Sequence, residues 1–239
     1  MMNIYTPLEE TLHIPWVLQA TILAGGLILV AGLSVRRKLA AEAGLLPDEG
    51  VTLRNVIEVL VEFLADLGQS IMGDEYRRYF PVVGTIFLFI LVSNLMGLIP
   101  FLAGATSDIN TTGGWALISF CVYNYVGIRT HGWKYIYQFM GPGIMTLNLG
   151  GKHYHVRLLA PIFLPLEIIL HLARILTLAV RLLANMFADH TVVAAWLVLV
   201  PVAVPAIFMG LGLMVSVLQA FVFCLLTMIY IGMALEEAH

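Results

Sequence analysis

The sequence has little charge. Only 11% of its 239 residues are Asp, Glu, Lys or Arg, whereas 60% are apolar or aromatic. A water-soluble domain is about 25% charged and about 45–50% apolar, because its surface needs polar side chains. The composition therefore excludes a water-soluble globular protein and predicts an integral membrane protein.

Cysteine is nearly absent, and the N-terminal segment lacks the pattern typical of a secretory signal. Cys121 and Cys224 each lie in an apolar run, so the sequence contains no disulfide framework. The N-terminal segment has Glu9 and Glu10 where a signal peptide would carry basic residues. The apolar run that follows, residues 14–34, exceeds the about 7–15 residues of a signal core, so we expect a retained transmembrane helix.

Apolar runs long enough to cross a bilayer are few. A hydrocarbon core of about 30 Å needs ~20 helical residues, and such runs occupy residues 14–34, 79–103 and 109–128. Residues 51–73 place apolar side chains at spacings of three and four, which predicts an amphipathic helix on the membrane surface or against a partner. With the longer apolar region at 158–235, the prediction is one all-α membrane domain across residues 1–239.

The region 158–235 is too long for ordinary crossings. Residues 166–200 contain no Gly or Pro, and as one helix they would measure ~52 Å at about 1.5 Å per residue. Fitting that length into a ~30 Å core requires a tilt of roughly 55°, beyond the usual about 0–40°. Pro201 and Pro205 bracket a break before a second over-long helix at 206–235. We therefore expect a strongly inclined two-helix hairpin.

Basic residues indicate the orientation. The connection between the first two spans and the one after the third span carry the Lys and Arg residues, whereas the N-terminal tail and residues 104–112 have none. Cytoplasmic loops carry such an excess. The N-terminus is therefore expected outside and the C-terminus in the cytoplasm.

One face of the first hairpin helix is polar. At about 100° per residue its polar side chains share an arc of roughly 80°; they are Glu167, His171, Arg174, Arg181 and Asn185. A charge at mid-bilayer costs at least about 2.5–3.5 kcal/mol, so two arginines there require an aqueous path or an anionic partner. No acidic residue lies near Arg181 on this face. For Arg174 snorkelling to a headgroup is the alternative, and for His171 a hydrogen-bonded interior role.

The second hairpin helix has a weaker polar stripe, formed by Ser216, Gln219, Thr227 and Tyr230. A glutamine inside a membrane needs a hydrogen-bond partner, so Gln219 either joins two helices or lines a solvated path. His190 projects away from the first stripe and is expected near an opening.

Several motifs resemble one family. Residues 181–190 read Arg-Leu-Leu-Ala-Asn-Met-Phe-Ala-Asp-His, and residues 218–230 read Leu-Gln-Ala-Phe-Val-Phe-Cys-Leu-Leu-Thr-Met-Ile-Tyr. Both resemble the two C-terminal helices of subunit a of F-type ATP synthases. Residues 93–100 and 107–112 are similar to that family's Asn-Leu-x-x-Leu-x-Pro segment and its Asp-x-Asn-x-Thr outer loop. The resemblance extends from about residue 49 to the end of the chain.

The resemblance implies a non-catalytic stator subunit that faces a rotating ring of c subunits. Each ring subunit carries a mid-membrane carboxylate, which supplies the missing anion for Arg181. By resemblance, Arg181 keeps that carboxylate ionised and separates two aqueous half-channels. Asn185 and Gln219 match positions near the arginine and the outer path, and Glu167 matches the cytoplasmic path. Tyr230 matches a residue that faces the same region.

The implied partners are the c-subunit ring, subunit b of the peripheral stalk, the lipid bilayer and the translocated proton or sodium ion. Nucleic acid, a metal and a cofactor are not expected, and nucleotide chemistry is expected on other subunits. The expected location is an energy-coupling membrane, the bacterial inner membrane.

The sequence departs from the family at two positions. Many members carry an acid or a histidine where this chain has Gly212, and some carry an acid where it has Gly97. We therefore expect other residues to serve the outer half-channel, and the candidates are Asp108, Asp189 and His190.

Two other classes of protein are alternatives. A secondary transporter or antiporter would show paired repeats with broken helices, and the sequence contains none. A structural scaffold would leave Arg181 unexplained. His153 and His155 are too few for a metal site, and we expect them in a surface loop.

Overall fold

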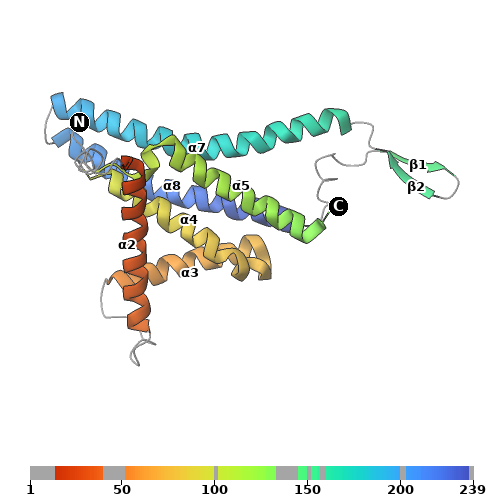
Figure 1. Cartoon of the computed structure of the whole chain (residues 1–239), viewed down its shortest axis with the longest axis horizontal. Coiled ribbons are helices and arrows are strands. Elements are labelled where there is room, and N and C mark those ends of the chain that lie inside the picture. The colour runs from red at the N-terminus through yellow and green to blue at the C-terminus, as the bar shows by residue number, and fades with distance from the viewer. Residues whose placement is uncertain are drawn as a thin grey trace.

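A computed structural model describes residues 14–39, 52–99, 102–132, 145–149, 152–156, 160–199 and 203–236. Its α-helices are α2 (Trp16–Leu39), α3 (Leu53–Met72), α4 (Tyr76–Gly97), α5 (Ile109–His131), α7 (Ala160–Leu199) and α8 (Ala203–Leu235). Two 3₁₀ turns, η2 (Gly73–Glu75) and η3 (Ala105–Ser107), flank α4. Figure 1 shows α7 and α8 running along the long axis of the molecule and α2 running across it.

The helical prediction is confirmed except for one hairpin. Strands β1 (Met145–Leu149) and β2 (Lys152–Val156) pair antiparallel, with Met145 opposite Val156. His153 and His155 lie in β2, so the prediction of a loop there is wrong. The Gly150–Gly151 dipeptide between the two runs is a hairpin signal that the sequence reasoning missed.

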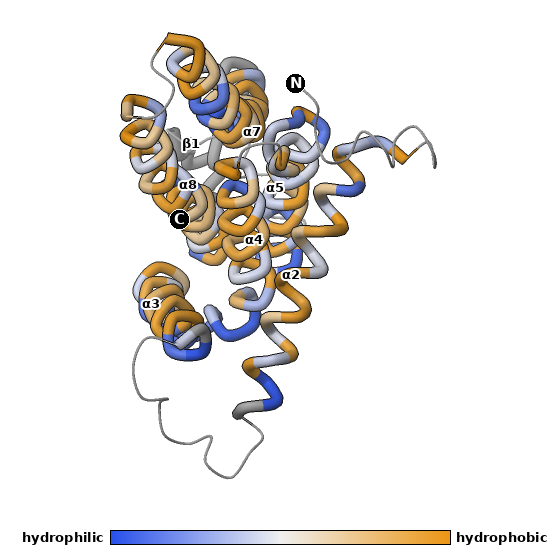
Figure 2. Tube along the Cα trace, turned by 90° about the vertical axis from the view of Figure 1, so that its left-hand side faces the viewer, coloured by the Kyte–Doolittle hydropathy of each residue, from blue (hydrophilic) through white to orange (hydrophobic). Residues whose placement is uncertain are grey.

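Within the described residues, three helical stretches are long and apolar enough to cross a membrane: Trp16–Arg37, Arg54–Gly97 and Ala203–Leu235. The chain is therefore a multi-pass membrane protein. Much of α2 and α7 consists of hydrophobic residues, as the colour along the tube in Figure 2 shows. Ile22 on α2 and Phe187 on α7 are 63% and 70% exposed, as suits contact with lipid or with partner helices.

The C-terminal pair of helices forms as predicted, but each helix begins earlier. Helix α7 starts at Ala160 and includes Pro165, and α8 starts at Ala203 and includes Pro205. Proline is tolerated in a first turn because its missing N–H has no helical partner there, which explains Pro205. At ~1.5 Å per residue, α7 and α8 measure about 60 and 50 Å. The rings of Trp196 and Phe208 stack with centroids 6.0 Å apart, joining the two helices near their connection.

The core lies where α4, α5, α7 and α8 meet. Its fully buried side chains include Ile86 and Ile90 from α4, Leu182 from α7 and Phe223 and Met228 from α8. A smaller cluster joins α2 to α4, where Ala20 and Ala24 pack against Phe89 and Met96. Small residues on α2 allow this close approach. The core therefore holds the two long helices against α4 and α5.

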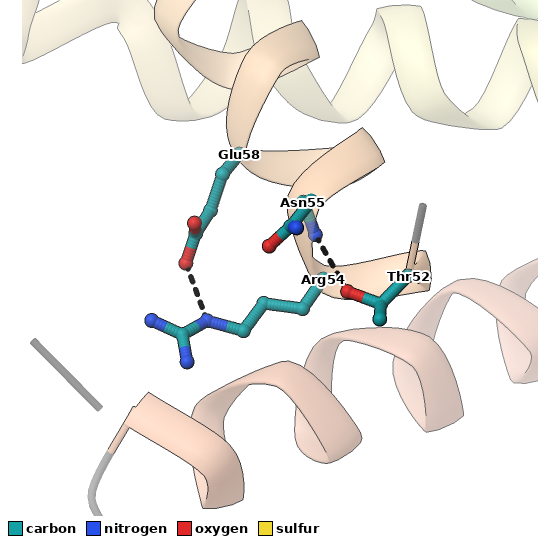
Figure 3. A network of polar contacts seen from close by, with 4 residues as sticks. All are labelled: Thr52, Arg54, Asn55 and Glu58. Atoms are coloured by element: carbon teal, nitrogen blue, oxygen red, sulfur yellow. Dashed lines mark hydrogen bonds and ion pairs between the residues drawn. The ribbon is translucent and has the colours of Figure 1, made fainter. Parts of the chain in front are cut away.

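Helix α3 is the predicted amphipathic helix. Thr52 caps its N-terminus by accepting from the Asn55 N–H at 3.3 Å, and Arg54 Nε donates to Glu58 Oε1 at 2.7 Å (Figure 3). One face packs on α4 and α8 through Leu64 and its neighbours. Val59 on another face is 64% exposed. The helix is confirmed, and its place on the membrane surface stays a prediction.

The connection after α4 folds back against that helix. A Cβ atom on Gly104 would collide with the Ser93 carbonyl oxygen and would lie 3.1 Å from the Gly97 nitrogen. The backbone N–H of Thr106, two residues later, donates to Ser93 Oγ at 3.0 Å. Only glycine therefore permits this backbone contact.

We expect Gly104→Ala to destabilise the protein by about 1–3 kcal/mol, because the added methyl group overpacks a backbone contact. The thermal dissociation temperature of the assembled complex measures the loss. Gly113→Ala is the matched control, since a Cβ at Gly113 has no neighbour within 4 Å. Equal stability of the two variants would contradict the proposed contact.

Candidate functional site

The polar face of α7 turns partly inward. Its five polar side chains are all half-buried rather than exposed: Glu167, His171, Arg174, Arg181 and Asn185. His171 contacts α5, and Arg174 and Asn185 contact α8, so the face predicted from spacing lies along these helices. Two polar groups result, one toward each end of the helix, with Arg181 between them.

The N-terminal group combines a histidine, an arginine and two tyrosines. The Tyr123 hydroxyl on α5 lies 2.8 Å from His171 Nδ1, and the two rings stack at 5.8 Å. His171 Nε2 lies 3.7 Å from Glu167 Oε1. The Arg174 guanidinium sits 5.0 Å from the centre of the Tyr230 ring, within cation–π distance.

These contacts concern the roles left open for His171, an interior hydrogen bond, and for Arg174, contact with a lipid headgroup. His171 has the hydrogen bond of an interior histidine, and Arg174 contacts an aromatic ring inside the helix bundle. Tyr123 was missed by the sequence reasoning, because a single tyrosine in an apolar helix gives no pattern. The group is an unbroken series of polar contacts from Glu167 to Tyr123.

Arg181 makes no hydrogen bond or ion pair to any residue that the structure describes. One turn further on, Asn185 Nδ2 donates to Gln219 Oε1 on α8 at 2.8 Å. Gln219 is 6% exposed, and its Nε2 has no partner within the described ranges. Gln219 therefore joins two helices and also keeps a buried donor for water or a ligand.

The C-terminal group surrounds a small cavity between α4, α7 and α8. The cavity measures about 10 Å³, the lower limit for one water molecule. Its polar lining consists of Asn94, Asn185, Asp189, Gly212, Ser216 and Gln219. The side chains thus provide carboxylate, amide and hydroxyl groups around a space for a single water.

Neighbouring side chains fill the space beside Gly212 and Gly97, the two positions where the sequence departs from the pattern of the family that it resembles. A Cβ at Gly212 would collide with Asp189 Oδ1 and lie 2.8 Å from Asp189 Oδ2. A Cβ at Gly97 would collide with the Met186 methyl group. The Asp189 carboxylate, which has no hydrogen bond to a described residue, therefore occupies the space of a side chain at position 212.

The other two candidates for the outer path lie near η3. His190 is exposed, and its Nε2 lies 3.4 Å from Ser107 Oγ. Asp108 Oδ1 accepts from the Asn110 N–H at 2.7 Å and caps α5. A helix cap alone accounts for Asp108, since aspartate is among the preferred N-cap residues.

A polar network that the site reasoning did not include supports the cavity from α4. Thr106 Oγ1 donates to Asn94 Oδ1 at 2.7 Å, and Asn94 Nδ2 donates to the Ser216 carbonyl at 3.3 Å. The hydroxyl oxygens of Ser119 on α5 and Thr227 on α8 are 3.0 Å apart. The signal for Asn94 was available, because an asparagine within an apolar run requires hydrogen-bond partners.

The described residues include no group of three or more His, Cys, Asp or Glu side chains able to hold a metal ion.

Comparison with known proteins identifies relatives along nearly the whole chain. The family model described as ATP synthase A chain matches residues 18–232. The chain is 40% identical to ATP synthase subunit a 1 of Syntrophotalea carbinolica, over 98% of this chain and 92% of that protein. It is 36% identical to ATP synthase subunit a of Bdellovibrio bacteriovorus, over 97% and 94% of the two chains. The chain therefore belongs to the ATP synthase A chain family, the subunit a family of ATP synthases.

Proposed function

We propose that the chain is the ion-translocating stator subunit of a rotary F-type ATP synthase, with two aqueous half-channels that Arg181 separates. The observation that carries the proposal is the position of Arg181, which has no ion-pair partner among the described residues, between two polar groups. At ~1.5 Å per residue, Arg181 lies about 15 Å along the helix from His171 and about 12 Å from Asp189.

The proposal explains why an apolar helix tolerates an arginine that pairs with no acid in the described part of the chain. A carboxylate on each c subunit would pass Arg181 as the ring turns and would be kept ionised by it. Each charge that crosses 100 mV releases about 2.3 kcal/mol. The ring gains this energy only if ions cannot pass directly from one half-channel to the other, and the fixed positive charge of Arg181 repels them.

The two polar groups provide the half-channels. Asp189, Ser216 and Gln219 form the inner part of the outer half-channel, and His190 and Asp108 lie toward its opening. Glu167, His171, Arg174 and Tyr230 form the cytoplasmic half-channel, to which the structure adds Tyr123 as a candidate. No residue in this scheme acts on nucleotide, because the chain is the non-catalytic membrane subunit.

Partners and location follow from the same assignment. The chain would face the c-subunit ring through α7 and α8, contact subunit b of the peripheral stalk and lie in the bacterial inner membrane. Its N-terminus would be outside and its C-terminus cytoplasmic. If α2 stands upright in the bilayer, the direction of α7 and α8 in Figure 1 makes them strongly inclined.

The test is ATP-driven ion uptake by vesicles that contain the complex assembled with or without this chain. We expect the complex without it to hydrolyse ATP but to move no ions, and addition of the chain to restore uptake. A protonophore and a sodium ionophore distinguish the two ions. Ion uptake without the chain would contradict the proposal.

A further inference from the structure

A cavity of about 550 Å³ opens at the end of the helix bundle where α3, η2 and α4 meet α5 and α8. Its size lies within the about 300–1,000 Å³ of small-molecule sites. None of the described lining residues comes from α7. The cavity is therefore separate from the polar face of α7 and from the proposed half-channels.

Four charged side chains line this cavity, two of each sign. Arg78 comes from the start of α4 and Arg129 from the end of α5, and Glu75 and Glu236 lie at η2 and just after α8. No ion pair joins any of the four to another described residue. Arg129 donates only to the Tyr125 hydroxyl at 3.2 Å, and Arg78 lies 5.9 Å from the Tyr79 ring. The charges are thus held apart around a space.

The rest of the lining includes apolar groups at the same helix ends. Ile71, Met72 and Leu235 contribute to the wall. Beside the cavity α8 approaches α3 closely, since a Cβ at Gly232 would lie 3.0 Å from the Ile71 carbonyl oxygen. A lining that combines apolar groups with charges of both signs suits a lipid at the membrane interface.

We propose that this cavity binds the headgroup of an aminophospholipid, a phosphate diester with a primary ammonium group, as in phosphatidylethanolamine. Arg78 and Arg129 would bind the phosphate, because guanidinium groups match its oxygen atoms. Glu75 and Glu236 would accept hydrogen bonds from the ammonium. Choline cannot donate these bonds, and glycerol carries no positive charge, so both carboxylates favour ethanolamine. The acyl chains would lie along the apolar wall.

The test measures lipid bound to the delipidated, assembled complex by native mass spectrometry. Phosphatidylethanolamine, phosphatidylcholine and phosphatidylglycerol are titrated separately in the same detergent. Loss of one charge-assisted contact weakens binding by about tenfold, so we expect R78Q/R129Q to bind phosphatidylethanolamine at least that much more weakly. E75Q/E236Q is expected to lose the preference for phosphatidylethanolamine over phosphatidylglycerol.

The chain offers two matched controls. Arg77 also lies beside a tyrosine, 6.0 Å from the Tyr76 ring, but does not line the cavity. Asp74 is the acidic neighbour of Glu75 in η2 and does not line it either. We expect R77Q and D74N to bind lipid as the unchanged protein does, and single variants R78Q and E75Q provide the comparison if a double variant does not assemble.

Each other result would overturn the proposal. Equal losses in R77Q and R78Q would indicate only a general surface charge effect. Tighter binding of phosphatidylglycerol than of phosphatidylethanolamine would assign an anionic lipid, and displacement of lipid by millimolar inorganic phosphate would assign a soluble anion. The readout is lipid mass, so it does not depend on ion pumping or on the half-channel proposal.

Discussion

Replacement of Arg181 with alanine is expected to abolish ATP-driven ion pumping while the complex still assembles. Assembly should survive because Arg181 makes no hydrogen bond or ion pair with any described residue. The change also removes a charge whose insertion costs at least about 2.5–3.5 kcal/mol. The pumping loss follows because the ring carboxylate would no longer meet a fixed cation as it passes.

The expected loss is large. Removing one partner of a buried charge pair costs about 3–5 kcal/mol, which corresponds to roughly 10² to 4 × 10³-fold in an equilibrium or rate. Ion uptake driven by ATP in vesicles, with ATP hydrolysis measured in parallel, gives the result. Passive leak through the complex should stay the same or rise, because the repelling charge between the half-channels is gone.

Two variants serve as controls for this change. Arg181→Lys keeps the charge and should keep the passive leak low. Thr177→Val changes a neighbour on α7 whose hydroxyl only donates to the Arg174 carbonyl at 3.1 Å, and it should leave pumping unchanged. Normal pumping in Arg181→Ala would mean that the polar face of α7 has a structural role alone.

The second large effect is expected when the carboxylate is moved by mutation from position 189 to position 212. Asp189→Ala is expected to lower ion pumping at least tenfold, because it removes the carboxylate from the outer cavity. Gly212→Asp should fail for another reason. Its side chain would meet the Asp189 carboxylate, so two like charges would share a space about one water in size, and overpacking adds about 1–3 kcal/mol.

The double variant Asp189→Ala with Gly212→Asp is expected to recover pumping relative to either single change. The double variant again has one carboxylate in the cavity, and the two side chains do not overlap. The effects of changes at two residues in contact are usually not additive. Gly210→Ala and Gly212→Ala form a matched pair of controls, since a Cβ at Gly210 has no neighbour within 4 Å. Additive losses in the double variant would show that the two positions act independently.

The polar face of α7 was predictable because helical spacing places Glu167, Arg174 and Arg181 on one side whatever surrounds the helix. The partners across helices were not predictable, since no spacing rule links Asn185 to Gln219 or His171 to Tyr123. These contacts depend on how α5, α7 and α8 pack, which involves residues far apart in the sequence.

The late predicted start of α8 has a physical origin. Proline breaks a helix interior but is accepted in the first turn, so treating Pro205 as a break placed the start of α8 too late. For Asp108 the sequence is compatible with two roles. Its position before an apolar run predicts a helix cap as readily as an ion path, and the structure shows the cap.

The contact between the Asp189 carboxylate and Gly212 could not be predicted from the sequence either. The sequence indicates that a family acid is missing there and offers Asp108, Asp189 and His190 as replacements. Only the packing of α7 on α8 brings the Asp189 carboxylate against that glycine. This contact leads us to propose Asp189 first among the three candidates.

The most direct test of the two half-channels is the side from which cysteines on α7 can be modified. His171→Cys and His190→Cys are introduced separately after Cys121 and Cys224 have been replaced with alanine, and a membrane-impermeant thiol reagent is added to one side of oriented vesicles. The account predicts that position 171 reacts only from the cytoplasmic side and position 190 only from the outside. Reaction of both positions from the same side would contradict the separation of two aqueous paths by Arg181.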